Sequence, residues 1–213
     1  MFENLNTIIL QGKKYPIRCD INVCEAVQDE FGSLPAFERK LLGLEFQRDE
    51  NGRIKTRTDD EGKEVPDFIL TEPSLKAIRI GIKTMAQEGK EFALAQGDPV
   101  PDIDVNMAVL DMQFDRETVA AQLHEEFVRC LEQKKREDLQ ICEEVKKGFE
   151  DEPIQFWRLR ANGVIFGLSN HEIGMLRLGY FNQMLYAYQE RYNMMIEKKI
   201  YVLPEKRTSI LDL

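Results

Sequence analysis

The stretch that decides the fold runs from residue 7 to residue 32 and reads TIILQGKKYPIRCDINVCEAVQDEFG. It opens with two β-prone runs, residues 7–10 and 15–18, joined by a loop whose glycine permits a tight turn. Asp20 then stands at an N-cap position, and Gly32 stands where a helix would stop. Between them, apolar residues recur at helical spacing: Val23, Cys24, Val27 and Phe31. This pattern predicts a hairpin followed directly by an amphipathic helix of about three turns.

Two more helices complete the first half of the chain. The second is expected to begin after Ser33, with Pro35 in its first turn. Its core-facing residues would be Phe37, Leu41 and Leu42. Thr71 is expected to cap a third helix that ends near Gly89. The apolar stripe of that helix comprises Leu75, Ile78, Ile82 and Met85.

Residues 44–66 differ in character from the helices on either side. Two polar, strand-like runs, residues 44–47 and 53–57, flank the sequence Asp49-Glu50-Asn51-Gly52. Asn-Gly is a strong signal for a hairpin turn. We therefore expect an exposed hairpin arm inserted between two helices, with poor order towards residues 59–62.

The middle of the chain predicts a domain boundary. Residues 96–106 read QGDPVPDIDVN, which suits an extended acidic linker over residues 96–113 between a region 1–95 and a region 114–213. Asp115 would then cap a long charged helix, and the block 134–138, KKRED, is its weakest part. That helix either projects or bends. Its apolar stripe comprises Val119, Leu123, Phe127, Cys130, Leu131, Leu139, Cys142, Val145 and Phe149.

The C-terminal region holds the most apolar helix. Residues 154–168 allow either a hairpin turning at Asn162-Gly163 or a short helix capped by those two residues and followed by a brief apolar link, which we favour slightly. Phe156 and Trp157 are the anchor candidates in both. Ser169 with Glu172 forms a capping box that opens the next helix. Its apolar residues are Ile173, Leu176, Leu178, Tyr180, Phe181, Met184, Leu185, Tyr186, Tyr188, Tyr192, Met194 and Met195. Such a helix is covered either by its own chain or by another. After Pro204 we expect a mobile tail. Together these elements predict a mainly α (α+β) protein.

Composition excludes several classes of partner. The 213 residues carry 29 Lys and Arg against 38 Asp and Glu, a net charge of −9, which disfavours nucleic acid and anionic membranes. No apolar run is long enough to span a membrane, and the acidic first residues do not resemble a signal peptide, so we expect a cytoplasmic protein. The four cysteines fit reduced structural thiols. Cys130 and Cys142 would lie about 120° apart around one helix and so form no joint site.

The sequence contains no motif for catalysis. It has no phosphate-binding glycine loop, and neither His124 nor His171 stands at metal-ligand spacing. Asp102, Asp104 and Asn106 imitate the start of a calcium loop, but the glycine and glutamate that such a loop needs are missing. We therefore expect no catalytic residue, cofactor or metal, and a protein that works through contacts with other proteins.

Both ends of the chain resemble a known family. The hairpin IILQGKKYPIRCD at residues 8–20, the helix INVCEAVQDEFGSL at 21–34 and the segment GLSNHEIGMLRLGYFNQMLYAYQERYN at 167–193 resemble tail assembly chaperones of long-tailed bacteriophages and related prophages. In that family the last part is often added through a programmed frameshift.

The resemblance implies a non-enzymatic chaperone in the bacterial host cytosol. Such a protein coats the tape-measure protein, keeps it soluble, self-associates, and leaves as the major tail protein polymerises, so that it is absent from the mature virion. The candidate partner-binding residues lie on the last helix: Leu176, Tyr180, Phe181, Met184, Leu185 and Tyr188. The alternatives are another phage structural, scaffold or adaptor protein that acts through its helices, or an enzyme with an unrecognised carboxylate site.

Overall fold

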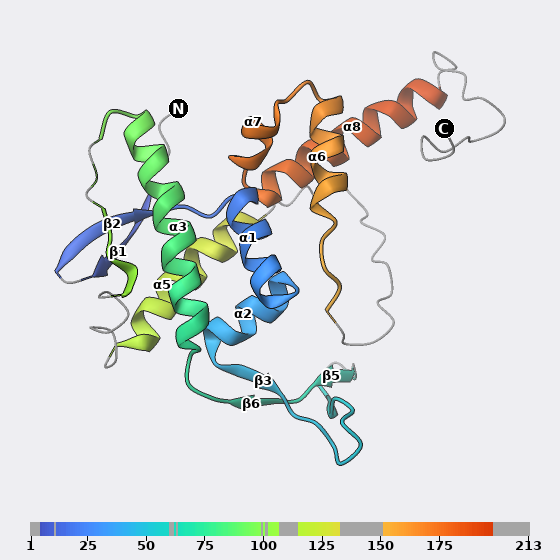
Figure 1. Cartoon of the computed structure of the whole chain (residues 1–213). Coiled ribbons are helices and arrows are strands. Elements are labelled where there is room, and N and C mark those ends of the chain that lie inside the picture. The colour runs from blue at the N-terminus through green and yellow to red at the C-terminus, as the bar shows by residue number, and fades with distance from the viewer. Residues whose placement is uncertain are drawn as a thin grey trace.

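The computed structural model describes residues 5–10, 12–59, 62, 64–98, 100, 102–106, 115–132 and 151–197, with backbone alone for 193–197. The described chain is mainly helical with three small two-stranded sheets, which confirms the predicted fold class (Figure 1). None of its described helices combines the length and apolar character needed to cross a membrane.

The N-terminal hairpin and helix form as predicted. Strand β1 (Asn6–Leu10) pairs antiparallel with β2 (Lys13–Ile17), and α1 (Ile21–Phe31) follows. The Asp20 carboxylate caps α1 by accepting a hydrogen bond from the Val23 N–H at 3.2 Å, and Gly32 ends it in the left-handed conformation. Helix α2 (Leu34–Leu42) starts after Ser33, whose hydroxyl accepts from the Ala36 N–H.

The inserted arm forms, but its strands pair differently from the prediction. The turn at Asp49-Glu50-Asn51-Gly52 is present, with a bridge between Arg48 and Ile54. Strand β3 (Leu44–Phe46), however, pairs with β6 (Phe68–Leu70), and β4 (Thr56–Thr58) pairs with β5 (Glu64–Pro66). The Phe46 and Phe68 rings stack with centroids 5.2 Å apart, which favours this closure of the arm near its base. Of the stretch expected to be poorly ordered, residues 60 and 61 lie outside the described part.

Helix α3 (Leu75–Ala95) differs from the prediction at both ends. Its N-cap is Ser74 rather than Thr71, because Thr71 instead bonds to the Gly43 carbonyl through its N–H and its hydroxyl. The helix also continues through Gly89. That glycine lets α3 lie against β2, since a Cβ there would stand 2.3 Å from the Pro16 carbonyl oxygen. At the start of the helix, Leu75 is exposed and lies outside the core.

Helix α5 (Arg116–Leu131) packs into the same core as α1, α2 and α3. The boundary expected at residues 96–113 therefore does not separate two cores; Ile103 and Val105 from this linker pack against the shared core. Asp115 occupies the N-cap position but makes no side-chain capping bond. The helix ends at Leu131, before the KKRED block, so it is not one continuous rod, and residues 133–150, including Cys142, lie outside the described part.

The C-terminal region is a set of three helices. Residues 156–165 form α6 (Phe156–Ile165), so a helix is correct for this segment and the hairpin is wrong. The helix does not end at Asn162-Gly163 as expected but continues through both residues to the C-cap Phe166, because Gly163 packs closely against Ile173 and Phe181. The Ser169–Glu172 capping box is confirmed, but the helix it opens, α7 (Asn170–Gly174), is short, and the chain restarts as α8 (Leu178–Glu197). The segment 198–213, with the expected mobile tail, lies outside the described part.

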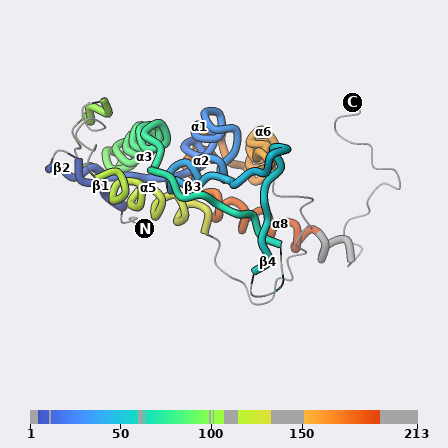
Figure 2. The backbone as a smooth tube through the Cα atoms, turned by 90° about the horizontal axis from the view of Figure 1, so that it is seen from below, coloured from blue at the N-terminus to red at the C-terminus, as the bar shows by residue number. Residues whose placement is uncertain are grey.

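The helices form two layers. Helices α3, α1 and α6 lie side by side in one layer, and α5 and α8 follow one another in the layer behind it (Figure 2). The core between them is continuous from the hairpin to α8, and its largest fully buried side chains include Phe37, Phe127 and Phe181. The fold thus places the end of α5 against the start of α8.

Candidate functional site

Helix α6 turns a large apolar surface outward. Phe156, Leu159 and Gly163 are buried on one side of the helix. On the opposite side Trp157 is 59% exposed and Ile165 is 62% exposed, and Val164 is exposed as well. Of the two predicted anchors, Phe156 therefore serves the core, whereas Trp157 is free to contact another molecule.

The candidate partner-binding residues lie on α8 and, for Leu176, on the link before it, and they do not form one exposed face. Phe181 is 1% exposed and belongs to the core, and Leu176, Met184 and Leu185 are half-buried. Tyr180 and Tyr188 are 54% and 44% exposed. The break before α8 sets this division, because it gives α8 an axis and a rotation that a single long helix would not have.

Aromatic contacts join α8 to the end of α6. The Phe166 ring lies 5.9 Å from that of Phe181 and 5.2 Å from that of Tyr188, measured between ring centroids. These contacts join the C-terminal end of α6 to α8. We call Trp157, Val164, Ile165, Tyr180 and Tyr188 the α6–α8 apolar surface.

The arm exposes a second group of apolar residues. In β6, Phe68, Ile69 and Leu70 are all exposed, and Leu70 is 83% exposed. The sequence did not single them out, because they follow the segment taken as the arm.

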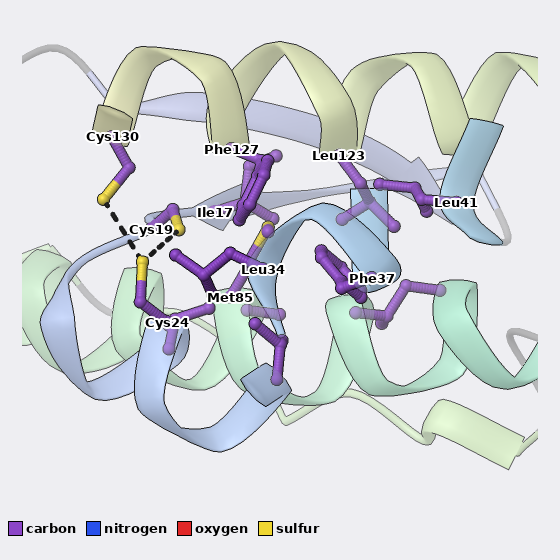
Figure 3. Close-up of a cluster of buried hydrophobic side chains, with 14 of the residues drawn as sticks. Ile17, Cys19, Cys24, Leu34, Phe37, Leu41, Met85, Leu123, Phe127 and Cys130 are labelled. Atoms are coloured by element: carbon purple, nitrogen blue, oxygen red, sulfur yellow. Dashed lines mark hydrogen bonds between the residues drawn. The ribbon is translucent and has the colours of Figure 1, made fainter. Parts of the chain in front are cut away.

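Three buried cysteines meet in the core, which the sequence did not predict. Cys19 lies between β2 and α1, Cys24 lies in the first half of α1, and Cys130 lies in the last turn of α5 (Figure 3). The Sγ atoms of Cys19 and Cys24 are 4.0 Å apart, and those of Cys24 and Cys130 are 3.8 Å apart. All three Sγ atoms lie within 4.8 Å of one another.

The three thiols differ in acidity. Burial raises the pKa of Cys19 well above its usual range, and the hydrogen bond with Cys130 raises the pKa of Cys24. Hydrogen bonds from Cys19 and Cys24 lower the pKa of Cys130, which also accepts the Leu178 N–H at 3.5 Å. Cys130 is therefore the thiol of the group that most readily carries negative charge.

A buried carboxylate lies one turn before Cys130. Glu126 is fully buried, and its Oε1 accepts hydrogen bonds from the Cys19 N–H at 3.0 Å and from Arg177 at 2.9 Å. Its Oε2 accepts from the Asn6 side chain at 2.8 Å. The carboxylate thus ties α5 to the hairpin, to the start of α1 and to the link before α8.

A second carboxyl group lies next to the cysteines. Burial, and after it the nearby carboxylate of Glu88, raise the pKa of Asp20 from 3.8 to about 8. The pKa of Glu88 is raised as well, chiefly by burial.

The other polar residues singled out in the sequence lie apart from these groups. His124 contacts Glu38 through Nε2 at 2.8 Å, and His171 is exposed in α7. Asp102 pairs with Lys90, and the Asp104 carboxylate accepts the Asn106 N–H at 3.0 Å. Each of these contacts is a surface pair or a turn, and none of them joins the cysteine group.

The sequence held no signal for the cysteine group. Cys19 and Cys24 stand five positions apart across a helix cap, and Cys130 is 106 positions further on. Only the packing of α5 on the junction between β2 and α1 brings them together.

Comparison with known proteins finds no relative of this chain: no protein-family model, no curated protein and no solved structure matches it. The α6–α8 apolar surface and the buried cysteine group are the two features that can bear on its function.

Proposed function

We propose that this chain is a non-enzymatic, cytoplasmic tail assembly chaperone that binds the tape-measure protein of a phage or prophage and keeps it soluble. The observation that carries the proposal is the α6–α8 apolar surface, where five large apolar side chains lie exposed on two neighbouring helices. Scattered exposed apolar residues are common, but a group of large apolar side chains on two neighbouring helices joined by the Phe166 contacts favours a binding role.

The chemistry of the surface suits an apolar helical client. Trp157, Tyr180 and Tyr188 offer wide contact areas at a small cost in side-chain entropy, and Val164 and Ile165 add aliphatic area. A tape-measure protein is a long, largely helical and apolar chain, so an amphipathic helix of this client can lie against such a surface. The net charge of −9 keeps the complex soluble through repulsion between copies.

The proposal revises the set of contact residues. Phe181 is part of the core and Leu176 packs against the core, so both contribute to the stability of the fold and neither is a contact residue for the client. Tyr180 and Tyr188 stay in the set, and Trp157, Val164 and Ile165 from α6 join it. Self-association through the same surface would compete with client binding.

The test is co-expression with the tape-measure protein encoded in the same genome. The wild-type chain should keep the client in the soluble fraction, and the variants Trp157→Ser with Ile165→Ser, and Tyr180→Ser, should lower the soluble yield about tenfold. Leu70→Ser is the matched control, because it removes an even more exposed apolar side chain from the base of the arm. Circular dichroism should show that every variant is folded.

Three results would contradict the proposal. The first is a client that stays insoluble with the wild-type chain. The second is a loss of client solubility that is as large for Leu70→Ser as for the α6–α8 variants. The third is the stable presence of this chain in purified particles, which would favour a structural component instead.

A further inference from the structure

The three buried cysteines converge from separate parts of the fold. Cys19 and Cys24 come from the two sides of the α1 cap, and Cys130 comes from the end of α5 (Figure 3). Each side chain is completely buried, and all three sulfur atoms point into the same small space. Among the described residues, this is the one group of three potential soft ligands that lie together.

The spacing of the sulfur atoms matches that of ligands around a single metal ion. With a metal–sulfur bond of about 2.3 Å, two thiolates on one ion stand roughly 3.8 Å apart in tetrahedral geometry and roughly 4.0 Å apart in trigonal geometry. The measured separations are 3.8 Å and 4.0 Å for two of the pairs, and at most 4.8 Å for the third. A small shift of Cys19 or Cys130 places all three sulfurs around one centre.

The surroundings favour bound thiolate. The Leu178 N–H donates to the Cys130 sulfur at 3.5 Å, a contact that also suits a metal-bound thiolate. Thiolates buried without a cation are costly, and a metal ion removes that cost by direct coordination. Sulfur ligands select zinc and cuprous ions over the hard ions magnesium and calcium.

We propose that Cys19, Cys24 and Cys130 form a three-thiolate site for a thiophilic metal ion, either Zn(II) or Cu(I). Each thiol loses its proton to solvent when the metal binds, and no change of oxidation state is involved. Cu(I) is satisfied by three sulfur ligands, whereas Zn(II) takes a fourth ligand. The bound ion would join the end of α5 to the β2–α1 junction and, through Leu178, hold the start of α8 in place.

The experiment uses the full-length protein, kept reduced with a phosphine. Because the sulfurs are buried, the metal is supplied during refolding from denaturant, as Zn(II), as Co(II) for its thiolate charge-transfer band, or anaerobically as Cu(I). After desalting, about one metal ion per chain should remain. The melting temperature should rise by roughly 5–15 °C at a hundredfold to thousandfold excess of metal over its Kd. The metal that stays bound after desalting, Zn(II) or Cu(I), is then identified as the ion that the site takes.

Alanine variants of the cysteines assign the ligands. Cys19→Ala, Cys24→Ala and Cys130→Ala should each lose the retained metal and the metal-dependent rise in melting temperature, while the metal-free variants stay folded by circular dichroism. Cys142→Ala is the matched control and should retain the metal. Less than about a tenth of an ion per wild-type chain in both the Zn(II) and the Cu(I) arms would overturn the proposal. Equal loss of metal in Cys142→Ala would overturn the three-sulfur assignment.

Discussion

Glu126 is a fully buried acidic residue, and its contribution to the free energy of unfolding can be measured. Glu126→Gln keeps the shape of the side chain but removes the charge that Arg177 faces at 2.9 Å. Because the variant loses the ionic part of the contact between Glu126 and the largely buried Arg177 side chain, we expect the free energy of unfolding to fall by about 3 kcal/mol. Glu125→Gln, on the exposed side of the same turn, should change it by less than about 0.5 kcal/mol. Urea denaturation of both variants is the measurement, and equal stability would contradict the role given to Glu126.

Two glycines of α3 face different neighbours, so the same substitution to alanine should have different effects on stability at the two positions. A Cβ at Gly89 would stand 2.3 Å from the Pro16 carbonyl oxygen, whereas one at Gly81 would stand 3.1 Å from a movable methyl group of Leu123. Alanine adds about 1 kcal/mol of helix propensity at both. Gly81→Ala should therefore be close to neutral, and Gly89→Ala should destabilise the fold by about 2 kcal/mol. Thermal unfolding of the pair tests this, and a stable Gly89→Ala variant would show that the close approach of α3 to β2 is not needed.

At the scale of the element, the capping box of α7 gives a prediction about pH. The N–H and the hydroxyl of Ser169 donate to the Glu172 carboxylate and lower its pKa below 4.5. The lowered pKa means that this contribution is present above pH 4.5 and is lost as the pH falls through the folded-state pKa. Wild type should thus be more stable than Glu172→Gln at neutral pH, and the difference should vanish in acid. A stability difference between wild type and Glu172→Gln that is unchanged at low pH would contradict this. Ser169→Ala removes the N-cap itself and should lower the free energy of unfolding by about 1 kcal/mol at neutral pH.

The division of the last helix into α7 and α8 shows what local sequence leaves open. The capping box correctly marks where the helix begins, but residues 175–177, where it breaks, contain no glycine or proline, and Gly174 and Gly179 beside the break stand within α7 and α8. The Met175 carbonyl accepts from Arg18 at 2.7 Å, and the Leu176 carbonyl accepts from the Ile21 N–H at 2.9 Å. The Met175 and Leu176 carbonyls thus accept hydrogen bonds from Arg18 and from the first residue of α1, and not from the N–H groups of a continuing helix. The break is therefore a product of contacts distant in sequence.

The whole molecule is predicted to unfold as one unit, because its two halves share a core. The Phe37 ring of α2 lies 5.3 Å from the Phe127 ring of α5, and Glu126 binds the Cys19 N–H. A fragment of residues 1–98 would leave this apolar surface uncovered, so it should show no cooperative thermal transition. The full chain should show a single transition by calorimetry and circular dichroism. Cooperative unfolding of the fragment would instead indicate an independent N-terminal domain.

By itself, the sequence determined the elements whose signals are local. The hairpin, the Asp20 and Ser33 caps, the turn at Asn51-Gly52 and the Ser169–Glu172 capping box all depend on residues a few positions apart, and all are present. Such features need little from the rest of the chain, because one side chain satisfies a neighbouring backbone group.

Only the tertiary structure decided which surfaces are free and which residues meet. Trp157 and Phe156 are neighbours in one helix, yet packing buries one and exposes the other. Likewise, Cys19, Cys24 and Cys130 become one group only when α5 lies across the start of α1. The physical reason is the same in both cases: burial and side-chain contact depend on the rotation and placement of whole helices, which the summed packing of distant residues sets and local sequence does not.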